Sequence, residues 1–164
     1  MTNIKYKRPS WDEYYFEIMH AVAKRATCDR GRSGCVIQKD NHILATGYVG
    51  APSGLPSCDE VGHFIQEVIG SDDTIEEHCI RTVHAEQNAI CHAAKLGIAI
   101  DGATLYCTMT PCRTCAMLII NSGIKQVICE KHYHNSTQEQ NSALMFKQCN
   151  VSISWLSDEV EVYE

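Results

Sequence analysis

Two short segments of the chain carry the residue types of a metal site. His84 and Glu86 stand two apart in "VHAEQNAI", and Cys112 and Cys115 stand three apart in "TPCRTC". On a helix, residues three apart share a face, whereas residues two apart point to different sides. The two thiols could therefore bind one metal ion from a first helical turn, where the helix dipole favours thiolates. His84 would add a nitrogen ligand, and Glu86 need not be a ligand.

These residues predict a zinc centre that does chemistry. Three protein ligands leave the fourth position of a tetrahedral zinc ion open, which is typical of catalytic rather than structural zinc. Glu86 could reach that position and move the protons of an attacking water. His-Ala-Glu together with Pro-Cys-x-x-Cys is the pattern of zinc nucleobase deaminases. The alternative is a closed structural zinc completed by a further Cys or His, which would leave Glu86 without a role.

Composition limits the classes of function. The 164 residues are 45% hydrophobic, which is enough for a single domain over residues 1–164. The sequence has no signal peptide and no apolar run of the ~20 residues that a membrane crossing needs, so we expect no membrane contact and a cytoplasmic location, the host cytoplasm if the source is viral. The net charge of −6 without a basic block counts against binding of long nucleic acid. Ten cysteines without a secretory signal favour thiols and metal sites over disulfides.

The elements that must position the four residues alternate along the chain. Apolar spacing predicts a helix at 11–26, a hairpin at 34–48, a helix at 85–96, a strand at 103–109, a helix at 112–122, a strand at 125–129, a helix at 137–148 and a strand at 150–155. Residues 49–82 read as a polar loop with a short helix near "HFIQEVI". The order predicts an α/β fold with a sheet between helices, in which helices 85–96 and 112–122 begin at one sheet edge.

Longer segments resemble the deoxycytidylate (dCMP) deaminase family, above all its bacterial and phage members. They are "KRPSWDEYYFEI" at 7–18, "ILATGYVGAPSGLPSCDEVGH" at 43–63, "HCIRTVHAEQNAI" at 78–90, "GATLYCTMTPCRTCAMLIINSGIKQVI" at 102–128 and "KHYHNS" at 131–136. The resemblance implies hydrolysis of dCMP to dUMP and ammonia, which feeds thymidylate synthesis. It implies the cytidine deaminase-like fold, a three-layer α-β-α arrangement with a five-stranded mixed sheet. It also implies a homohexamer, activated by dCTP and inhibited by dTTP, each with Mg²⁺.

The resemblance also assigns contacts with the nucleoside. The backbone amide of Ala85 would hold the pyrimidine O2, and Tyr133 would pack near the base, although an ordinary core or surface tyrosine fits as well. The family usually has Gly-Tyr-Asn-Gly at 47–50, and its Asn contacts the sugar. Here the third residue is Val49, whose side chain cannot hydrogen-bond. Sugar recognition, and the choice between dCMP and dCTP, therefore stay open.

Arg30 in "CDRGRSG" is the predicted ligand of the 5′-phosphate. The planar fork of an Arg binds two phosphate oxygens at once, and this loop should border the zinc pocket. Similar family members also keep an Arg at this place, whereas the place of Arg32 varies. The alternative is that both residues are solvated loop charges.

A second zinc is a further hypothesis. Cys28, Cys58 and His78 stand where some phage relatives hold a structural zinc, and His63 or Cys79 could complete the set. Such a metal would order the polar loop 49–82, which has little core of its own. Free thiols and surface histidines fit this spacing as well, because it extends over a long loop.

A regulatory site is predicted at the end of helix 85–96. Phage relatives use a basic residue there to bind the nucleotide effector, and Lys95 stands at the matching place with His92 nearby. A solvated Lys in a last helical turn is also favourable, because it faces the negative end of the helix dipole.

Other functions compete with dCMP deamination. A tRNA adenosine deaminase would need a basic surface, which the net charge opposes. A cytidine, cytosine or dCTP deaminase would share the chemistry and differ in substrate. An inactive zinc- and nucleotide-binding regulator is the alternative from another class, and it would not need Glu86. Ammonia release from a panel of cytosine nucleotides separates these functions.

Overall fold

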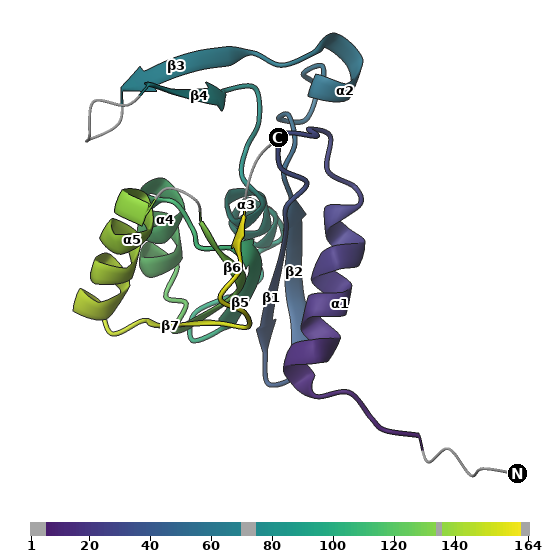
Figure 1. Cartoon of the computed structure of the whole chain (residues 1–164). Coiled ribbons are helices and arrows are strands. Elements are labelled where there is room, and N and C mark those ends of the chain that lie inside the picture. Colours follow the sequence, from purple (N-terminus) through teal and green to yellow (C-terminus); the bar gives the residue numbers. More distant parts are fainter. Residues whose placement is uncertain (1–5, 70–74, 134–135, 162–164) are drawn as a thin grey trace, which may run out of the picture.

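A mixed sheet between two layers of helices forms the body of the molecule (Figure 1). The structure is a computed structural model and describes residues 6–69, 75–133 and 136–161. Residues 70–74 of the predicted loop and residues 134–135 of the resembling segment 131–136 lie outside these ranges. The three-layer α/β prediction is confirmed.

The sheet has the strand order β2-β1-β5-β6-β7, and a short β8 also pairs with β6. Its strands are β1 (Gly34–Lys39), β2 (His42–Tyr48), β5 (Thr104–Met109), β6 (Gln126–Tyr133), β7 (Ser152–Trp155) and β8 (Val160–Glu161). β1 runs antiparallel to β2 and β5, whereas β6 is parallel to β5, β7 and β8. The main path therefore has the five strands expected, with β8 added where β6 extends beyond β7.

The helices are amphipathic and cover opposite faces of the sheet. They are α1 (Trp11–Ala23), α3 (Ala85–Leu96), α4 (Arg113–Asn121) and α5 (Ser136–Gln148). α1 begins with a capping box of Ser10 and Glu13 and packs Tyr15 on one face. α3, α4 and α5 bury apolar side chains, among them Ala89 and Phe146, on the other face. None of the helices in the described ranges has the length and apolarity that a membrane crossing requires.

Gly47 allows β2 and α3 to approach closely. A Cβ atom at this position would lie 2.2 Å from the carbonyl oxygen of Ala85 and 2.5 Å from the amide nitrogen of Ala89. Such distances are impossible for real atoms, so any larger residue would push α3 away from the sheet. The glycine thus sets the depth at which the first turn of α3 enters the molecule.

A two-stranded ribbon stands apart from the sheet, above the carboxyl ends of its parallel strands (Figure 1). It pairs β3 (Ile65–Ile69) with β4 (Ile75–Cys79), and the short α2 (Cys58–Val61) precedes it. The predicted helix near "HFIQEVI" is therefore wrong. The pattern of Phe64, Ile65, Val68 and Ile69 fits one helix face, but the segment finds backbone partners in β4 instead.

Candidate active site and metal centre

The candidate metal centre lies between the first turns of α3 and α4. His84 is the N-cap residue of α3, Cys112 is the N-cap residue of α4, and Cys115 lies in the first turn of α4. Nδ1 of His84 is 3.5 Å from Sγ of Cys112 and 3.3 Å from Sγ of Cys115. Ligands of one tetrahedral zinc, at ~2.3 Å for sulfur and ~2.0–2.1 Å for nitrogen, would be about 3.6 Å apart. The three side chains therefore fit a single zinc ion.

The pKa values of the three candidate ligands depend on one another. The hydrogen bond with Cys115, helped by His84, lowers the pKa of Cys112 to about 4. The same pairing with Cys112, together with burial, raises the pKa of Cys115 well above its ordinary value. The hydrogen bond with Cys112 raises the pKa of His84 to about 9. Cys112 is therefore already a thiolate, and a cation bound here would displace the protons that Cys115 and His84 retain.

Glu86 reaches the same centre from inside the first turn of α3. Its carboxylate is buried, with the residue 8% exposed, and Oε2 lies 3.7 Å from Sγ of Cys115. Burial raises the pKa of Glu86 because the charged form loses its water. A buried carboxyl group with a raised pKa next to a metal centre is a candidate for proton transfer.

A pocket of about 420 Å³ opens onto this centre. Cys28, His78 and Cys79, named for the second metal site, lie on its wall. The residues predicted for the catalytic centre and the substrate that lie there are Arg30, Val49, His84, Ala85, Glu86, Cys112 and Tyr133. They come from separate parts of the chain, namely the loop before β1, the end of β2, the two helix starts and the end of β6. The structure therefore brings the predicted zinc, proton-transfer and substrate residues to one cavity.

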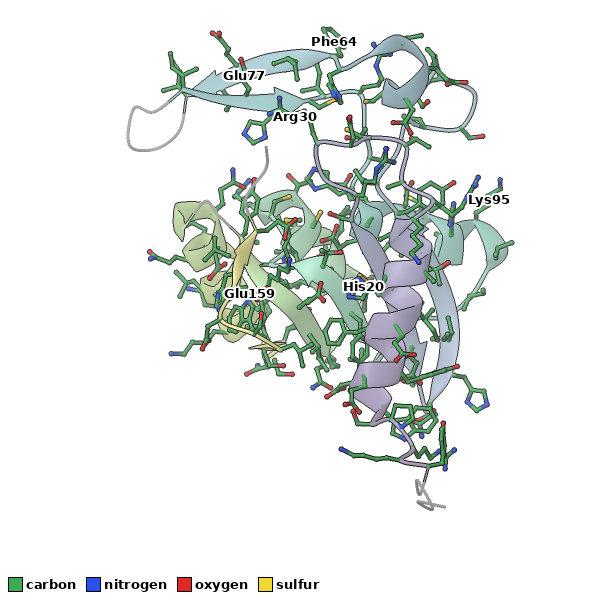
Figure 2. All side chains as sticks on the ribbon, turned by 45° about the vertical axis from the view of Figure 1, so that its right-hand side comes forward. His20, Arg30, Phe64, Glu77, Lys95 and Glu159 are labelled. Atoms are coloured by element: carbon green, nitrogen blue, oxygen red, sulfur yellow. The ribbon has the colours of Figure 1, made fainter. Side chains whose placement is uncertain are left out.

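Arg30 and Arg32 have different surroundings, although they are two residues apart. Arg30 is half-buried on the pocket wall, and its Nη2 donates a hydrogen bond of 3.0 Å to the backbone oxygen of Glu77. Nη1 lies 3.6 Å from the Glu77 carboxylate, and Figure 2 shows Arg30 beneath the β3–β4 ribbon. Arg32 is not part of the wall; it donates to the backbone oxygen of Ala26 and to Asp59.

Asn88 is a supporting residue that the sequence reasoning missed. Its Nδ2 donates a hydrogen bond of 2.8 Å to the backbone oxygen of Tyr48, which ties the end of β2 and the adjacent Val49 to α3. An Asn inside a helix is unfavourable unless its side chain has a partner elsewhere. The place of Asn88 inside the predicted helix, in "HAEQNAI", is the feature of the sequence that could have indicated this contact.

The comparisons with known proteins agree with this geometry. A family model described as "Cytidine and deoxycytidylate deaminase zinc-binding region" matches residues 9–131. The chain belongs to this deaminase family. The deoxycytidylate deaminase of Mycobacterium phage D29 is 37% identical over 126 residues, which are 76% of this chain and 97% of the phage protein. "ComE operon protein 2" of Bacillus subtilis (strain 168) is 35% identical over 147 residues, 90% of this chain and 71% of that protein.

Other relatives of this family differ in length. The chain spans 44% of the deoxycytidylate deaminase of Schizosaccharomyces pombe, at 35% identity. The crystal structure of dCMP deaminase from the cyanophage S-TIM5, in complex with dCMP and dUMP, superposes with a TM-score of 0.71 at 28% identity. It covers 92% of this chain and 100% of the phage chain, so the family fold accounts for nearly the whole structure.

A second cluster of potential metal ligands in this deaminase lies between the loop before β1, α2 and the β3–β4 ribbon. Its members are Cys28, Cys58, His63 and Cys79, whose ligand atoms all lie within 4.8 Å of one another. Nδ1 of His63 is 3.7 Å from Sγ of Cys28, and Sγ of Cys58 is 3.5 Å from Sγ of Cys79. Four such atoms are the number that a closed structural zinc requires.

The sequence prediction of His78 in this cluster is corrected. Adjacent residues of a strand point to opposite sides, and here Cys79 and not His78 belongs to the four ligand atoms, with its Sγ near that of Cys58. Burial opposes ionisation of Cys79, but backbone hydrogen bonds with Arg81 and Phe64 outweigh it and lower its pKa to about 7. Cys79 therefore has a stronger tendency than an ordinary thiol to bind as a thiolate.

The predicted regulatory residues of this deaminase lie away from the pocket. Lys95 is exposed in the last turn of α3 (Figure 2). His92, one turn earlier, is also exposed, and its Nδ1 lies 3.2 Å from the backbone oxygen of Thr46. Neither residue lines the cavity at the metal centre.

Proposed function

We propose that this protein hydrolyses dCMP to dUMP and ammonia, a reaction that supplies thymidylate synthesis. The observation that carries the proposal is one pocket lined by His84, Cys112, Glu86 and a half-buried Arg30. The first three suit a zinc-dependent attack on an aminopyrimidine ring, and the fourth suits a phosphate. The S-TIM5 enzyme, whose fold this chain shares, was crystallised with dCMP and dUMP.

The proton transfers fall to Glu86. A zinc ion held by His84, Cys112 and Cys115 would activate water for attack at neutral pH. Glu86 takes the proton of that water and delivers it to ring N3 while the water oxygen attacks C4. It then takes the proton of the hydroxyl now bound to C4 and passes it to the amine, so that the C4–N bond breaks, ammonia departs and C4 becomes a carbonyl. Burial raises the pKa of this carboxyl group, which makes it a stronger base than an exposed glutamate and so supports the uptake of the proton from water.

The remaining pocket residues serve substrate recognition. The backbone amide of Ala85, at the start of α3, holds the pyrimidine O2. Tyr133 packs near the base, and Val49 offers the sugar an apolar wall in place of the amide that relatives use. Arg30 binds the 5′-phosphate. Its hydrogen bond to the backbone oxygen of Glu77 orients its side chain at the pocket edge.

The proposal includes an assembly and a regulator. We infer a cytoplasmic homohexamer that dCTP activates and dTTP inhibits, each with Mg²⁺, at a site that includes Lys95 and His92. The resemblance to regulated phage enzymes and the position of both residues outside the pocket support this inference. Size-exclusion chromatography with light scattering checks the assembly, and a monomer at micromolar concentration contradicts it.

Ammonia release from dCMP, dCTP and cytidine tests the main proposal. The zinc-loaded protein should act fastest on dCMP and much more slowly on cytidine, which has no phosphate for Arg30 to bind. A faster rate on dCTP would favour the dCTP deaminase alternative. Background rates on all three compounds, with zinc bound, would falsify the deaminase assignment and favour a nucleotide-binding regulator.

The first prediction separates metal binding from proton transfer. Replacing His84, Cys112 or Cys115 with Ala should remove zinc and activity together, because each supplies one of the three ligand atoms. Glu86→Gln should keep zinc but lose turnover by about 100-fold or more, because an amide cannot carry the proton. Metal analysis and ammonia release are measured on the same samples. Loss of zinc in Glu86→Gln contradicts the assigned role.

The second prediction concerns the phosphate. A charge-assisted contact contributes about 1.5–3 kcal/mol, so Arg30→Ala should lower kcat/KM for dCMP by about 10- to 150-fold. The residual rate on deoxycytidine, which has no phosphate, should hardly change. Arg32→Ala is the matched control, because Arg32 carries the same charge on the same loop without lining the pocket. Equal losses on both substrates would show that Arg30 only holds the loop.

The third prediction concerns the second metal. The purified protein should contain two zinc ions per chain, and Cys79→Ser should lose one of them while it keeps the catalytic one. His78→Ala should keep both, since His78 lies outside the cluster. Inductively coupled plasma mass spectrometry gives the count. One zinc per chain in the unmodified protein disproves the second site.

The fourth prediction concerns regulation. Lys95→Gln should weaken activation by dCTP and inhibition by dTTP, because effector phosphates need a cation, and it should leave turnover without effector largely intact. Lys147→Gln is the control, since Lys147 is also an exposed Lys in the last turn of its helix. Rates are measured against effector concentration with Mg²⁺ present. An unchanged response in Lys95→Gln removes Lys95 from the effector site.

A further inference from the structure

Four side chains form a closed ring beside the pocket. The carboxylate of Glu139 accepts hydrogen bonds from Nδ1 of His132 at 2.6 Å and from Oγ1 of Thr110 at 2.9 Å. Thr110 in turn accepts one from Nε1 of Trp155 at 2.9 Å. The ring closes because the indole of Trp155 stacks on His132, with 4.7 Å between centroids and 13° between planes. No member of this ring is among the residues to which the proposed mechanism assigns a role.

The ring joins elements that are far apart in the sequence. Glu139 lies in the first turn of α5, His132 near the end of β6, Trp155 at the end of β7, and Thr110 directly after β5. Thr110 is only 2% exposed, and the side chains of Glu139 and His132 are 18% and 26% exposed. The partly buried carboxylate contacts β6 and the residue after β5 directly, and Trp155 of β7 through Thr110 and His132. Such a network fixes the relative positions of these elements more firmly than a surface pair would.

Glu139 also holds the pocket residue Tyr133 directly. Its Oε2 accepts a hydrogen bond of 2.7 Å from the backbone amide of Tyr133, in addition to the bond from Thr110. Both Tyr133 and Thr110 line the pocket, and Thr110 stands two residues before the metal ligand Cys112. Oε2 of Glu139 therefore links two parts of the pocket wall, namely Thr110 near the metal ligands and Tyr133 near the proposed position of the base.

We propose that Glu139 is a positioning residue for the deamination reaction, which sets Tyr133 relative to the metal centre. This inference rests on the proposed function. Glu139 touches neither the metal ligands nor the pocket space; it acts through the Tyr133 amide and the Thr110 hydroxyl. Without it, two donors on the pocket wall and His132 lose their acceptor, and the end of β6 becomes free to shift. A shift of about 1 Å in a positioning contact can cost about 100-fold in rate.

The chemistry of the ring predicts which substitution retains function. Gln at position 139 keeps one carbonyl oxygen that can accept from both Tyr133 and Thr110, and its amide can donate to the Nδ1 of His132 in the other tautomer. Ala offers no acceptor at all. Glu139→Gln should therefore recover most of the activity that Glu139→Ala loses, although both remove the charge.

Glu130 offers a matched control on β6, the strand that also holds His132 and Tyr133. Its side chain is 17% exposed and pairs with Nε2 of His20 at 2.7 Å, much as Glu139 pairs with His132. It does not line the pocket. Glu130→Ala removes a carboxylate of similar burial from a carboxylate–histidine pair of similar length, although His20 is 52% exposed and His132 26%. It therefore measures what the loss of such a carboxylate does to the fold alone.

The experiment measures kcat, KM, zinc content and the affinity for dUMP in each variant. Glu139→Ala should raise KM for dCMP and weaken dUMP binding by about tenfold or more, with zinc content unchanged; Glu130→Ala should resemble the unmodified protein. In a Tyr133→Ala background, Glu139→Ala should have less than about a twofold further effect, because the side chain that Glu139 positions is then absent. If Glu139→Ala does not fold, Glu139→Asp replaces it, since its carboxylate is one methylene too short to keep all the bonds.

The outcomes separate the proposed deamination of dCMP from the positioning role of Glu139. An unmodified protein without activity on dCMP contradicts the proposed function. Activity in the unmodified protein together with unchanged KM and dUMP affinity in Glu139→Ala or Glu139→Asp overturns the positioning role. The role is also overturned if Glu139→Gln is as impaired as Glu139→Ala, or if the loss is equally large without the Tyr133 side chain.

Discussion

Three ligand atoms from two helices must lie close enough to share one metal ion, and this requirement constrains most of the fold. His84 and Cys112 are both N-cap residues with extended backbone angles, so each ligand sits where a strand-like segment turns into a helix. An N-cap side chain can reach forward past the helix end, whereas a residue in the middle of a helix cannot. The first turns of α3 and α4 must therefore converge. Gly47 permits this on one side, because only a residue without Cβ lets β2 and α3 approach so closely.

The mixed topology of the sheet then determines what surrounds the centre. β5 and β6 are parallel and end at the same edge, where Thr110 follows β5 and Tyr133 is the last residue of β6. β1 is antiparallel to β5, so its beginning lies at that edge, together with the loop of Arg30 and, through the pair Gly34 and Tyr48, the end of β2. Four strand ends thus supply the pocket wall. An all-parallel sheet would place the Arg30 loop at the opposite edge, far from the metal ligands.

The sequence predicted what depends on short spacing and missed what depends on pairing between distant segments. The ligand set of the metal centre and the helix at 85–96 follow from residues a few positions apart, and the parallel β–α–β order brings them together. The β3–β4 ribbon could not be predicted in this way, because Ile65 and Val68 fit a helix until β4 supplies partners. The inclusion of His78 in the predicted second cluster, to which only its neighbour Cys79 belongs, has the same origin. A shift of one residue in a strand changes the side to which a side chain points. Glu139 lies in a polar helix start and gives no sign in the sequence of its contacts with β5 and β6.

The buried acidic groups of the centre explain why a bound cation would stabilise it. Glu86 is buried beside two thiols, and burial raises the pKa of its carboxyl group, which means that the ionised form is costly here. Gln87 donates one hydrogen bond of 3.5 Å to Cys115, and among the described residues Arg30 is the one Lys or Arg on the pocket wall. A zinc ion would supply positive charge directly beside these acids. The same ion would then stabilise the buried acids and provide the chemistry, so binding of metal, stability of the helix starts and catalysis depend on one set of contacts.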